Sequence, residues 1–124
     1  MNFQPGSLLI LEDHPAMLTY YRDILRDEGY ILLMAASVAD AKQIYDQNRA
    51  SVRGIISDGH VIGMETGDSF VEYVRKNGFT GPVIAASVSL ALRESFIKAG
   101  ATAFTTEKTD APPMLLKQLP RREA

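Results

Sequence analysis

Short apolar runs alternate with longer segments of helical periodicity along most of this chain, and few folds accommodate that order. The runs are four or five residues long and rich in Ile, Val and Leu, as is typical of strands that a parallel sheet buries on both faces. Runs of this length are also compatible with buried helical turns. They comprise Ser7–Leu11, Ile31–Ala35, Gly54–Ser57, Pro82–Ala86 and Thr102–Thr105.

Between the runs, apolar residues recur at the three- and four-residue spacing of one helical face. They comprise Met17, Leu18, Tyr21, Ile24 and Leu25, then Ala41, Ile44 and Tyr45, then Phe70, Val71 and Val74, then Leu92, Phe96 and Ala99, and finally Leu115, Leu116 and Leu119. Helix starts are predicted at Pro15, Ser37, Ser89 and Pro112–Pro113, and helix ends at Gly29, Asn77–Gly78, Gly100 and Pro120. The repeated order of strand and helix predicts one doubly wound α/β domain over residues 1–124, with a parallel sheet and right-handed crossovers.

Composition places the chain among ordinary globular domains and removes several classes of site. The 124 residues are 46% hydrophobic and 23% charged, and a net charge of -2 argues against bulk attraction to nucleic acid. The absence of cysteine excludes a disulfide scaffold, a thiolate zinc site and a cysteine nucleophile. No apolar run approaches the roughly 20 residues of a membrane span, and the N-terminus lacks the features of a signal peptide. We therefore expect a soluble, cytoplasmic protein.

Polar residues follow most of the predicted strands, where ligands of open α/β sheets bind. These residues are Glu12, Asp13, Asp58, Ser87, Glu107 and Lys108. The three carboxylates of Glu12, Asp13 and Asp58 would repel one another at one edge, and a hard divalent cation with oxygen ligands relieves that repulsion. The set therefore indicates a Mg²⁺ site.

Each of these residues also has a purely structural interpretation. A single acid at a strand end is often a solvated loop residue, and Asp13 is well placed to cap the helix that begins at Pro15. His14 is interpreted as a loop residue because no second histidine stands at ligand spacing. The sequence carries no catalytic triad, nucleophile elbow or glycine-rich nucleotide motif. The basic residues Lys117, Arg121 and Arg122 form too small a cluster to indicate nucleic acid.

Four motifs resemble the receiver domain of two-component response regulators, and the resemblance spans about Leu8 to Leu119. Leu9–Pro15 resembles the family's first strand with its acidic pair, and Ile55–Asp58 resembles the third strand, which ends in the phosphoacceptor. Pro82–Ser87 resembles the fourth strand, which ends in Ser or Thr. Ala99–Ala101 with Phe104 resembles the segment that leads to the active-site lysine. The resemblance implies a flavodoxin-like sheet of five parallel strands in the order 2-1-3-4-5.

The resemblance also implies a mechanism. Asp58 is the expected nucleophile, which becomes an acyl phosphate in a Mg²⁺-dependent reaction. Asp13 and Asp58 are the expected direct metal ligands, with Glu12 acting through water and His60 through its backbone carbonyl. Metal affinity is therefore predicted to depend on Asp13 more than on Glu12.

Further expectations concern the switch and the partners. Ser87 and Lys108 are expected to contact the phosphoryl group, and Ser87 and Phe104 to form the conformational switch. The implied partner is a histidine kinase or a histidine phosphotransfer protein, with a fused or separate output domain and no contact of this domain with nucleic acid or membrane. The domain is not expected to be an enzyme, beyond assisting its own phosphorylation and dephosphorylation.

The sequence departs from the family pattern at three places. Val61 and Ile62 stand where Met-Pro is usual, and Gly67 comes about one position late. Glu107 occupies the lysine position, while Lys108 follows it without the usual proline. We predict that a bulge or altered turn brings Lys108 to the site, because a carboxylate there would oppose phosphorylation. The alternative is that Glu107 keeps the place. The last helix is also short, and nothing that could be an output domain follows within the sequence.

Two other functions fit parts of the pattern. A degenerate receiver would act as an interaction module without phosphorylation, and Glu107 at the lysine position favours it. A Mg²⁺-dependent hydrolase of similar topology would need a second aspartate two residues after the nucleophile, where His60 stands. The intact acidic residues favour the phosphoacceptor over both.

Overall fold

The computed structural model describes residues 6–120 and contains one five-stranded sheet. All paired strands are parallel, and their order is β2-β1-β3-β4-β5. The strands are β1 Ser7–Leu11, β2 Ile31–Ala35, β3 Val52–Asp58, β4 Val83–Ala86 and β5 Ala103–Thr105. The predicted fold class and strand order are confirmed.

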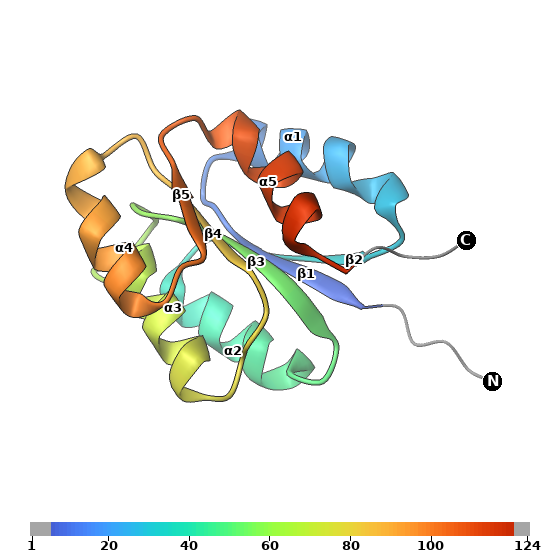
Figure 1. Cartoon of the computed structure of the whole chain (residues 1–124), viewed down its shortest axis with the longest axis horizontal. Helices are drawn as coiled ribbons and strands as arrows, with labels where there is room; N and C mark the ends of the chain where they lie inside the picture. The colour runs from blue at the N-terminus through green and yellow to red at the C-terminus, as the bar shows by residue number, and fades with distance from the viewer. Residues whose placement is uncertain (1–5, 121–124) are drawn as a thin grey trace.

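Helices cover both faces of this sheet, with α1 and α5 on one face and α2, α3 and α4 on the other (Figure 1). Their bounds are α1 Pro15–Leu25, α2 Val38–Asn48, α3 Gly67–Lys76, α4 Arg93–Ala99 and α5 Ala111–Gln118. Short 3-10 turns lie at Arg26–Glu28 (η1), Leu90–Leu92 (η2) and Lys108–Asp110 (η3). The three layers leave the carboxyl ends of the strands open at one side of the molecule.

The inner strand β1 shows why the apolar runs contain no alternating polar residues. Leu8 and Ile10 pack under α1 and α5, while Leu9 and Leu11 pack under α2 and α3. All four side chains are completely buried. Because helices cover both faces of a parallel sheet, the residues of β1 are buried whichever face they point to.

Several predicted boundaries agree with the structure. Ser37 caps α2, since its hydroxyl accepts a hydrogen bond from the Asp40 backbone N–H at 3.1 Å. Gly29 and Gly100 follow helical segments with φ of 85° and 116°, in the left-handed region that glycine adopts without strain.

Other boundaries are corrected by the structure. Ser89 makes no side-chain cap, because the 3-10 turn η2 separates it from α4, which begins only at Arg93. Helix α5 begins at Ala111, one residue before the predicted proline pair. Strand β3 begins at Val52 rather than Gly54. The prediction started too late because the exposed Arg53 interrupts the apolar run at the beginning of the strand.

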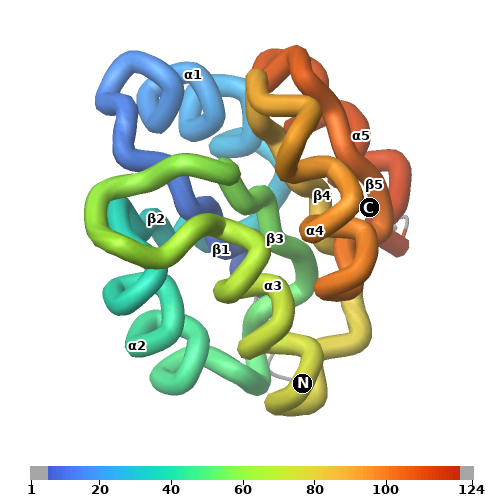
Figure 2. Tube along the Cα trace, turned by 90° about the vertical axis from the view of Figure 1, so that its left-hand side faces the viewer, coloured from blue at the N-terminus to red at the C-terminus, as the bar shows by residue number. Residues whose placement is uncertain are grey.

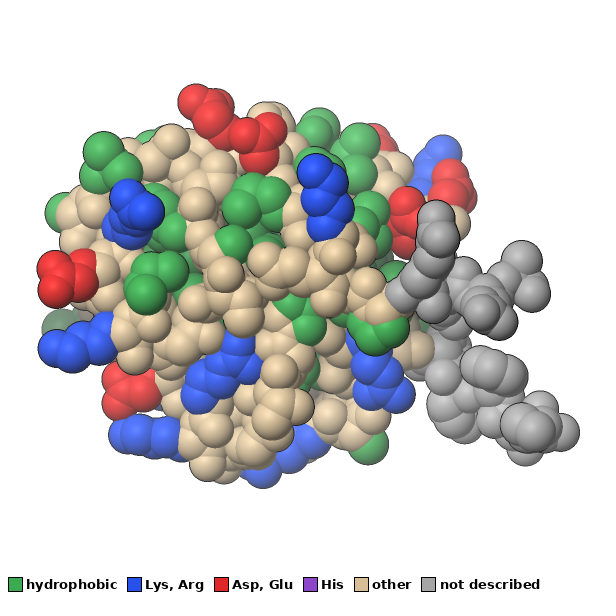
Figure 3. Space-filling model, viewed as in Figure 1, with side chains coloured by type: hydrophobic (Ala, Val, Ile, Leu, Met, Phe, Trp, Pro, Cys, Tyr) green, Lys and Arg blue, Asp and Glu red, His purple; other side chains and the backbone are tan. Residues whose placement is uncertain are grey.

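Charged side chains are dispersed on the surface. On the face drawn in Figure 3, Lys and Arg side chains are separated by acidic, apolar and neutral ones. Of the basic residues singled out in the sequence, Lys117 is exposed on α5, whereas Arg121 and Arg122 lie outside the described residues. Within residues 6–120, no helix has both the length and the apolar character needed to cross a membrane.

Candidate functional site

The fold gathers the polar strand-end residues at the carboxyl edge of the sheet, which faces the viewer in Figure 2. Glu12 follows β1, Asp58 ends β3 and Ser87 follows β4. Glu12, Asp58 and Ser87 are only 1%, 5% and 1% exposed to solvent, respectively. Polar groups buried to this extent require partners, and those partners define the site.

Lys108 supplies the positive charge. Its Nζ lies 3.0 Å from Glu12 Oε1 and 2.9 Å from Asp58 Oδ2. Strand β5 ends at Thr105, so strand alternation no longer governs the direction of the following side chains. The chain turns, Glu107 is exposed, and the 3-10 turn η3 starts with Lys108 directed at the carboxylates. A turn after β5, rather than a bulge within it, delivers the lysine.

The charges of this group perturb one another. Burial raises the pKa of the Glu12 carboxyl, and although the hydrogen bond from Lys108 opposes this, the neighbouring Asp58 charge adds to the increase. Burial lowers the pKa of the Lys108 ammonium, but its hydrogen bonds to Asp58 and Glu12 outweigh that effect and raise the pKa overall. The ammonium therefore keeps its proton at neutral pH and serves as a fixed counter-charge.

Three carboxylates surround this one cation. Oxygens of Glu12, Asp13 and Asp58 lie within 4.8 Å of one another. With Lys108 as counter-ion, the group keeps an excess of two negative charges, which a divalent cation with oxygen ligands fits. Glu12 uses both oxygens, one for Lys108 and one for the backbone N–H of His14, whose side chain is exposed. Asp13 makes no hydrogen bond or ion pair with any other described residue.

Two glycines allow the backbone to pack closely around Asp58, and only one of them drew attention in the sequence. A Cβ on Gly67 would stand 1.7 Å from the Asp58 carbonyl oxygen, so any other residue there would displace the phosphoacceptor candidate. A Cβ on Gly59 would lie 2.7 Å from Ser87 Oγ. The Gly59 backbone N–H also donates to Asp58 Oδ1 at 2.7 Å. Sequence analysis missed Gly59, although its place directly after the strand-end aspartate was a usable signal.

Of the two predicted switch residues, Ser87 lies beside this group and Phe104 lies in β5. Ser87 Oγ accepts a hydrogen bond from the Ser89 backbone N–H at 3.1 Å. Phe104 is half-buried in β5, with its ring 6.1 Å from that of Phe96 in α4. The structure thus connects the hydroxyl to the loop before α4 and the ring to α4 itself.

The loop after β3 has its own attachments, as its unusual sequence implied. Ile62 forms an isolated parallel bridge with Ser37, and Lys42 on α2 pairs with Glu65 at 3.3 Å. In Figure 2 this loop passes in front of β1 and β2. His60 is exposed at its start. The loop after β3 is therefore attached to α2 and to the residue that caps it.

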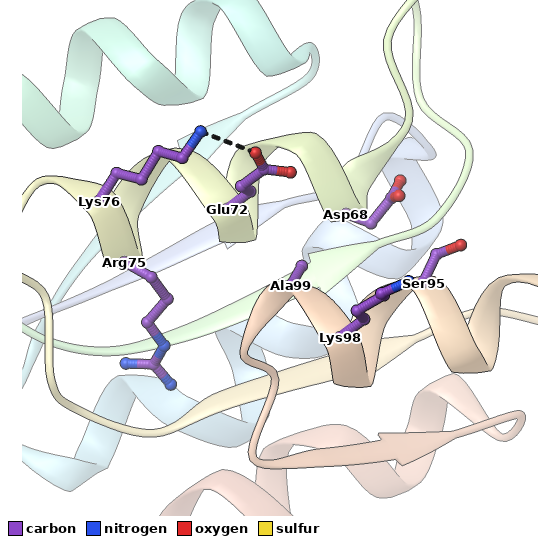
Figure 4. Close-up of a pocket in the computed structure, with 7 residues that line it drawn as sticks. All are labelled: Asp68, Glu72, Arg75, Lys76, Ser95, Lys98 and Ala99. Atoms are coloured by element: carbon purple, nitrogen blue, oxygen red, sulfur yellow. Dashed lines mark ion pairs between the residues drawn. The ribbon is translucent and has the colours of Figure 1, made fainter.

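A concavity of about 550 Å³ lies between α3 and α4 (Figure 4). Its lining mixes acids and bases, and Lys76 pairs with Glu72 at 2.9 Å. The guanidinium of Arg75 points away from both (Figure 4) and donates to the carbonyl oxygens of Phe79, Gly81 and Gly100. None of the residues predicted to carry chemistry lines this cleft.

Comparison with known proteins agrees with this geometry. The family model described as "Response regulator receiver domain" matches residues 8–119. The fold resembles the chemotaxis protein CheY4 of Vibrio cholerae, with 22% identity, a TM-score of 0.77, and coverage of 94% of this chain and 100% of the other. It also resembles a CheY-like receiver domain protein of Methanospirillum hungatei JF-1, with 20% identity, a TM-score of 0.78, and coverage of 92% and 93%.

A third similar structure is the CheX-CheY-BeF3-Mg+2 complex of Borrelia burgdorferi, with 18% identity, a TM-score of 0.74, and coverage of 92% of this chain and 86% of that chain. No curated protein matches the sequence. Identities this low establish the common fold, whereas the family model establishes the family.

Proposed function

The chain belongs to the response regulator receiver domain family, and we propose that it accepts a phosphoryl group on Asp58 and thereby switches a protein-interaction surface. One observation carries the proposal: a single ammonium, that of Lys108, contacts two buried strand-end carboxylates, including the one that ends β3. Receiver domains are signalling domains rather than classical enzymes. The feature that favoured a degenerate receiver was Glu107, and that side chain is exposed.

In the proposed step, an oxygen of the Asp58 carboxylate attacks the phosphorus of a phosphohistidine. An O–P bond forms while the P–N bond breaks, and the electron pair leaves with the imidazole. The product carries roughly -1.5 to -2 charges at neutral pH. The Lys108 ammonium, 2.9 Å from Asp58 Oδ2, would be the counter-charge, and the Ser87 hydroxyl beside Gly59 would donate to a phosphoryl oxygen.

A divalent cation belongs to this proposal as a cofactor. Asp13 and Asp58 would hold Mg²⁺ directly, the His60 carbonyl would contribute a further oxygen, and Glu12 would act through water. The hydrogen bonds support ranking Asp13 above Glu12, since both Glu12 oxygens already have partners while those of Asp13 do not. When bound, Mg²⁺ would neutralise negative charge as the phosphoryl group approaches Asp58.

The proposed switch transmits phosphorylation to α4 and β5. If Ser87 turns to the phosphoryl oxygen, it gives up the hydrogen bond from Ser89 that now shapes the loop before α4. Phe104, which is half-buried against Phe96, would then change its packing. A histidine kinase or phosphotransfer protein is the proposed donor, and a protein that reads this surface is the proposed output partner.

The experiment is phosphorylation by acetyl phosphate with Mg²⁺, followed by intact-mass measurement. We expect the wild-type protein to gain one phosphoryl group and the Asp58→Asn variant to gain none. Asp23→Asn, which alters an exposed carboxylate on α1, is the matched control and should behave like the wild type. An unchanged mass gain in Asp58→Asn would reject the site, and no gain in the wild type would reject phosphoacceptor function.

A further inference from the structure

The 3-10 turn that carries Lys108 is tied to α1 by two adjacent tyrosines. The hydroxyl of Tyr21 donates to the Lys108 carbonyl oxygen at 3.1 Å, and that of Tyr20 donates to the Thr109 carbonyl oxygen at 3.1 Å. Tyr21 lies 87 residues from Lys108 in sequence. Both hydrogen bonds therefore connect the lysine turn with the helix that follows the acidic pair.

This turn has few other constraints. No proline follows Lys108, so the backbone is not restrained there by a ring. Within η3, the carbonyl of Glu107 accepts from the Asp110 N–H at 2.9 Å, and the Lys108 carbonyl accepts from the Ala111 N–H. On the strand side, the Thr105 hydroxyl accepts from the Glu107 N–H at 3.0 Å. These bonds are local and set the shape of the turn, while the strand before it is held to the loop after β4 by the hydrogen bond from the Ser87 N–H to the Thr105 carbonyl oxygen at 3.0 Å.

The tyrosine bonds hold the turn itself, between β5 and α5, against α1. The Tyr21 residue is only 1% exposed, and its ring belongs to the core that α1 and α5 form against the sheet. Its hydroxyl is consequently a fixed donor, whereas Tyr20 is half-buried and its bond is solvent-exposed. Helix α1 starts only two residues after Asp13, so a turn held to α1 is also held to the acidic pair.

We propose that Tyr21, assisted by Tyr20, is the positioning residue that holds the Lys108 ammonium against Glu12 and Asp58. The tyrosine hydroxyl restrains the backbone of the turn, as a proline directly after Lys108 would do. The inference rests on the proposed function of Asp58, and it adds a residue that touches neither phosphate nor metal. Tyr21 acts through Lys108 alone.

The first test reads the lysine directly and needs no phosphorylation. Tyr21→Phe keeps the buried ring and removes only the donor, so the variant should fold. We expect the Lys108 side-chain ammonium NMR signal to move toward that of the exposed Lys117 and to broaden. Tyr20→Phe should give a smaller change, and Tyr73→Phe, which removes a hydroxyl bonded to Asp46 on another surface, should give none. An unchanged Lys108 signal in Tyr21→Phe would overturn the proposal.

The second test is a double-mutant cycle on the rate of phosphorylation by acetyl phosphate. Tyr21→Phe should slow the reaction about three- to tenfold in the wild-type background, because the counter-charge is misplaced. In the Lys108→Met background the same change should have no further effect. Equal slowing in both backgrounds would show a general structural role and overturn the proposal. If the wild type is not phosphorylated at all, the proposed function fails, while the NMR measurement still decides whether Tyr21 positions the lysine.

Discussion

The half-buried cations Lys108 and Arg75 lie in different parts of this domain and bind different kinds of partner. Lys108 contacts ionised side chains, Glu12 and Asp58, at the carboxyl edge of the sheet. Arg75 donates its hydrogen bonds to backbone carbonyls and lies over the Phe79 ring, and it joins the C-terminal end of α4 at Gly100 to the loop after α3. The ammonium is a compact point charge, whereas the guanidinium is a planar fork with several donors.

The difference shows how one fold separates chemistry from support. Carboxylates can exchange one cation for another or accept a new charged group, so the partners of Lys108 can be rearranged. Removing Arg75 takes the donor away from three loop carbonyls, of which that of Phe79 belongs to a buried residue. Burial lowers the pKa of Arg75, whereas the pKa of Lys108 is raised by its acidic partners against the effect of burial. We therefore expect Arg75 to govern stability and Lys108 to govern ion binding.

The largest expected effect is on stability at Arg75. Arg75→Met should lower the free energy of unfolding by about 2 to 4 kcal/mol, because hydrogen bonds from a charged donor to three loop carbonyls are lost. Urea unfolding measures this. Lys76→Met, which breaks an exposed pair on the same helix, should change stability by less than about 0.5 kcal/mol. Equal losses of unfolding free energy in Arg75→Met and Lys76→Met would contradict the prediction that Arg75 governs stability.

Lys108→Met should affect ion binding more than the fold. Without Mg²⁺, we expect unfolding free energy to fall by about 1 to 3 kcal/mol, since two buried carboxylates lose their counter-charge. Added Mg²⁺ should restore most of that loss, because it replaces the missing positive charge and binds only the folded state. Thermal unfolding with and without Mg²⁺ measures both parts. The opposite result, a loss that Mg²⁺ leaves unchanged, would make Lys108 a structural residue like Arg75.

Within the acidic group, Asp13 and Glu12 should differ. Asp13→Asn should weaken Mg²⁺ binding about tenfold or more, because the freest carboxylate is a direct ligand. Glu12→Gln should weaken it less, since both Glu12 oxygens already have partners. Calorimetric titration of Mg²⁺ into each variant distinguishes them, and equal affinities or a larger loss for Glu12→Gln would contradict the ranking.

The smallest effect is expected for a charge pair without burial. Hydrogen bonds from Arg49 and Tyr73 lower the pKa of the Asp46 carboxyl below its ordinary 3.8. A lowered folded-state pKa means that Asp46 stabilises the fold above its ordinary pKa and that this contribution is lost as the pH falls through the lowered value. The stability difference between wild type and Asp46→Asn should therefore shrink below about pH 4. Acid unfolding of both proteins, with Asp23→Asn as control, measures this, and a difference independent of pH would contradict it.

Much of the fold was predictable because it depends on local patterns. Apolar runs and helical spacing identified every strand and helix, and the Ser37 cap and the two glycine stops marked their ends correctly. The errors arose where local signals were ambiguous. Arg53 concealed the start of β3, and the 3-10 turn after Ser89 delayed α4. The edge of the sheet where polar residues gather followed from topology, since carboxyl ends of parallel strands share one side.

The sequence by itself determined the alternation of strands and helices, the acidic residues at the strand ends and the lack of a proline after Lys108, because each is a property of neighbouring residues. Only the tertiary structure decided that Lys108 rather than Glu107 points at Asp58, and that Tyr21 holds its turn. Beyond the end of β5, side-chain direction no longer follows strand alternation. It depends instead on contacts between residues far apart in the sequence, including the Lys108 ion pairs with Glu12 and Asp58 and the hydrogen bond from Tyr21, which form only in the folded chain.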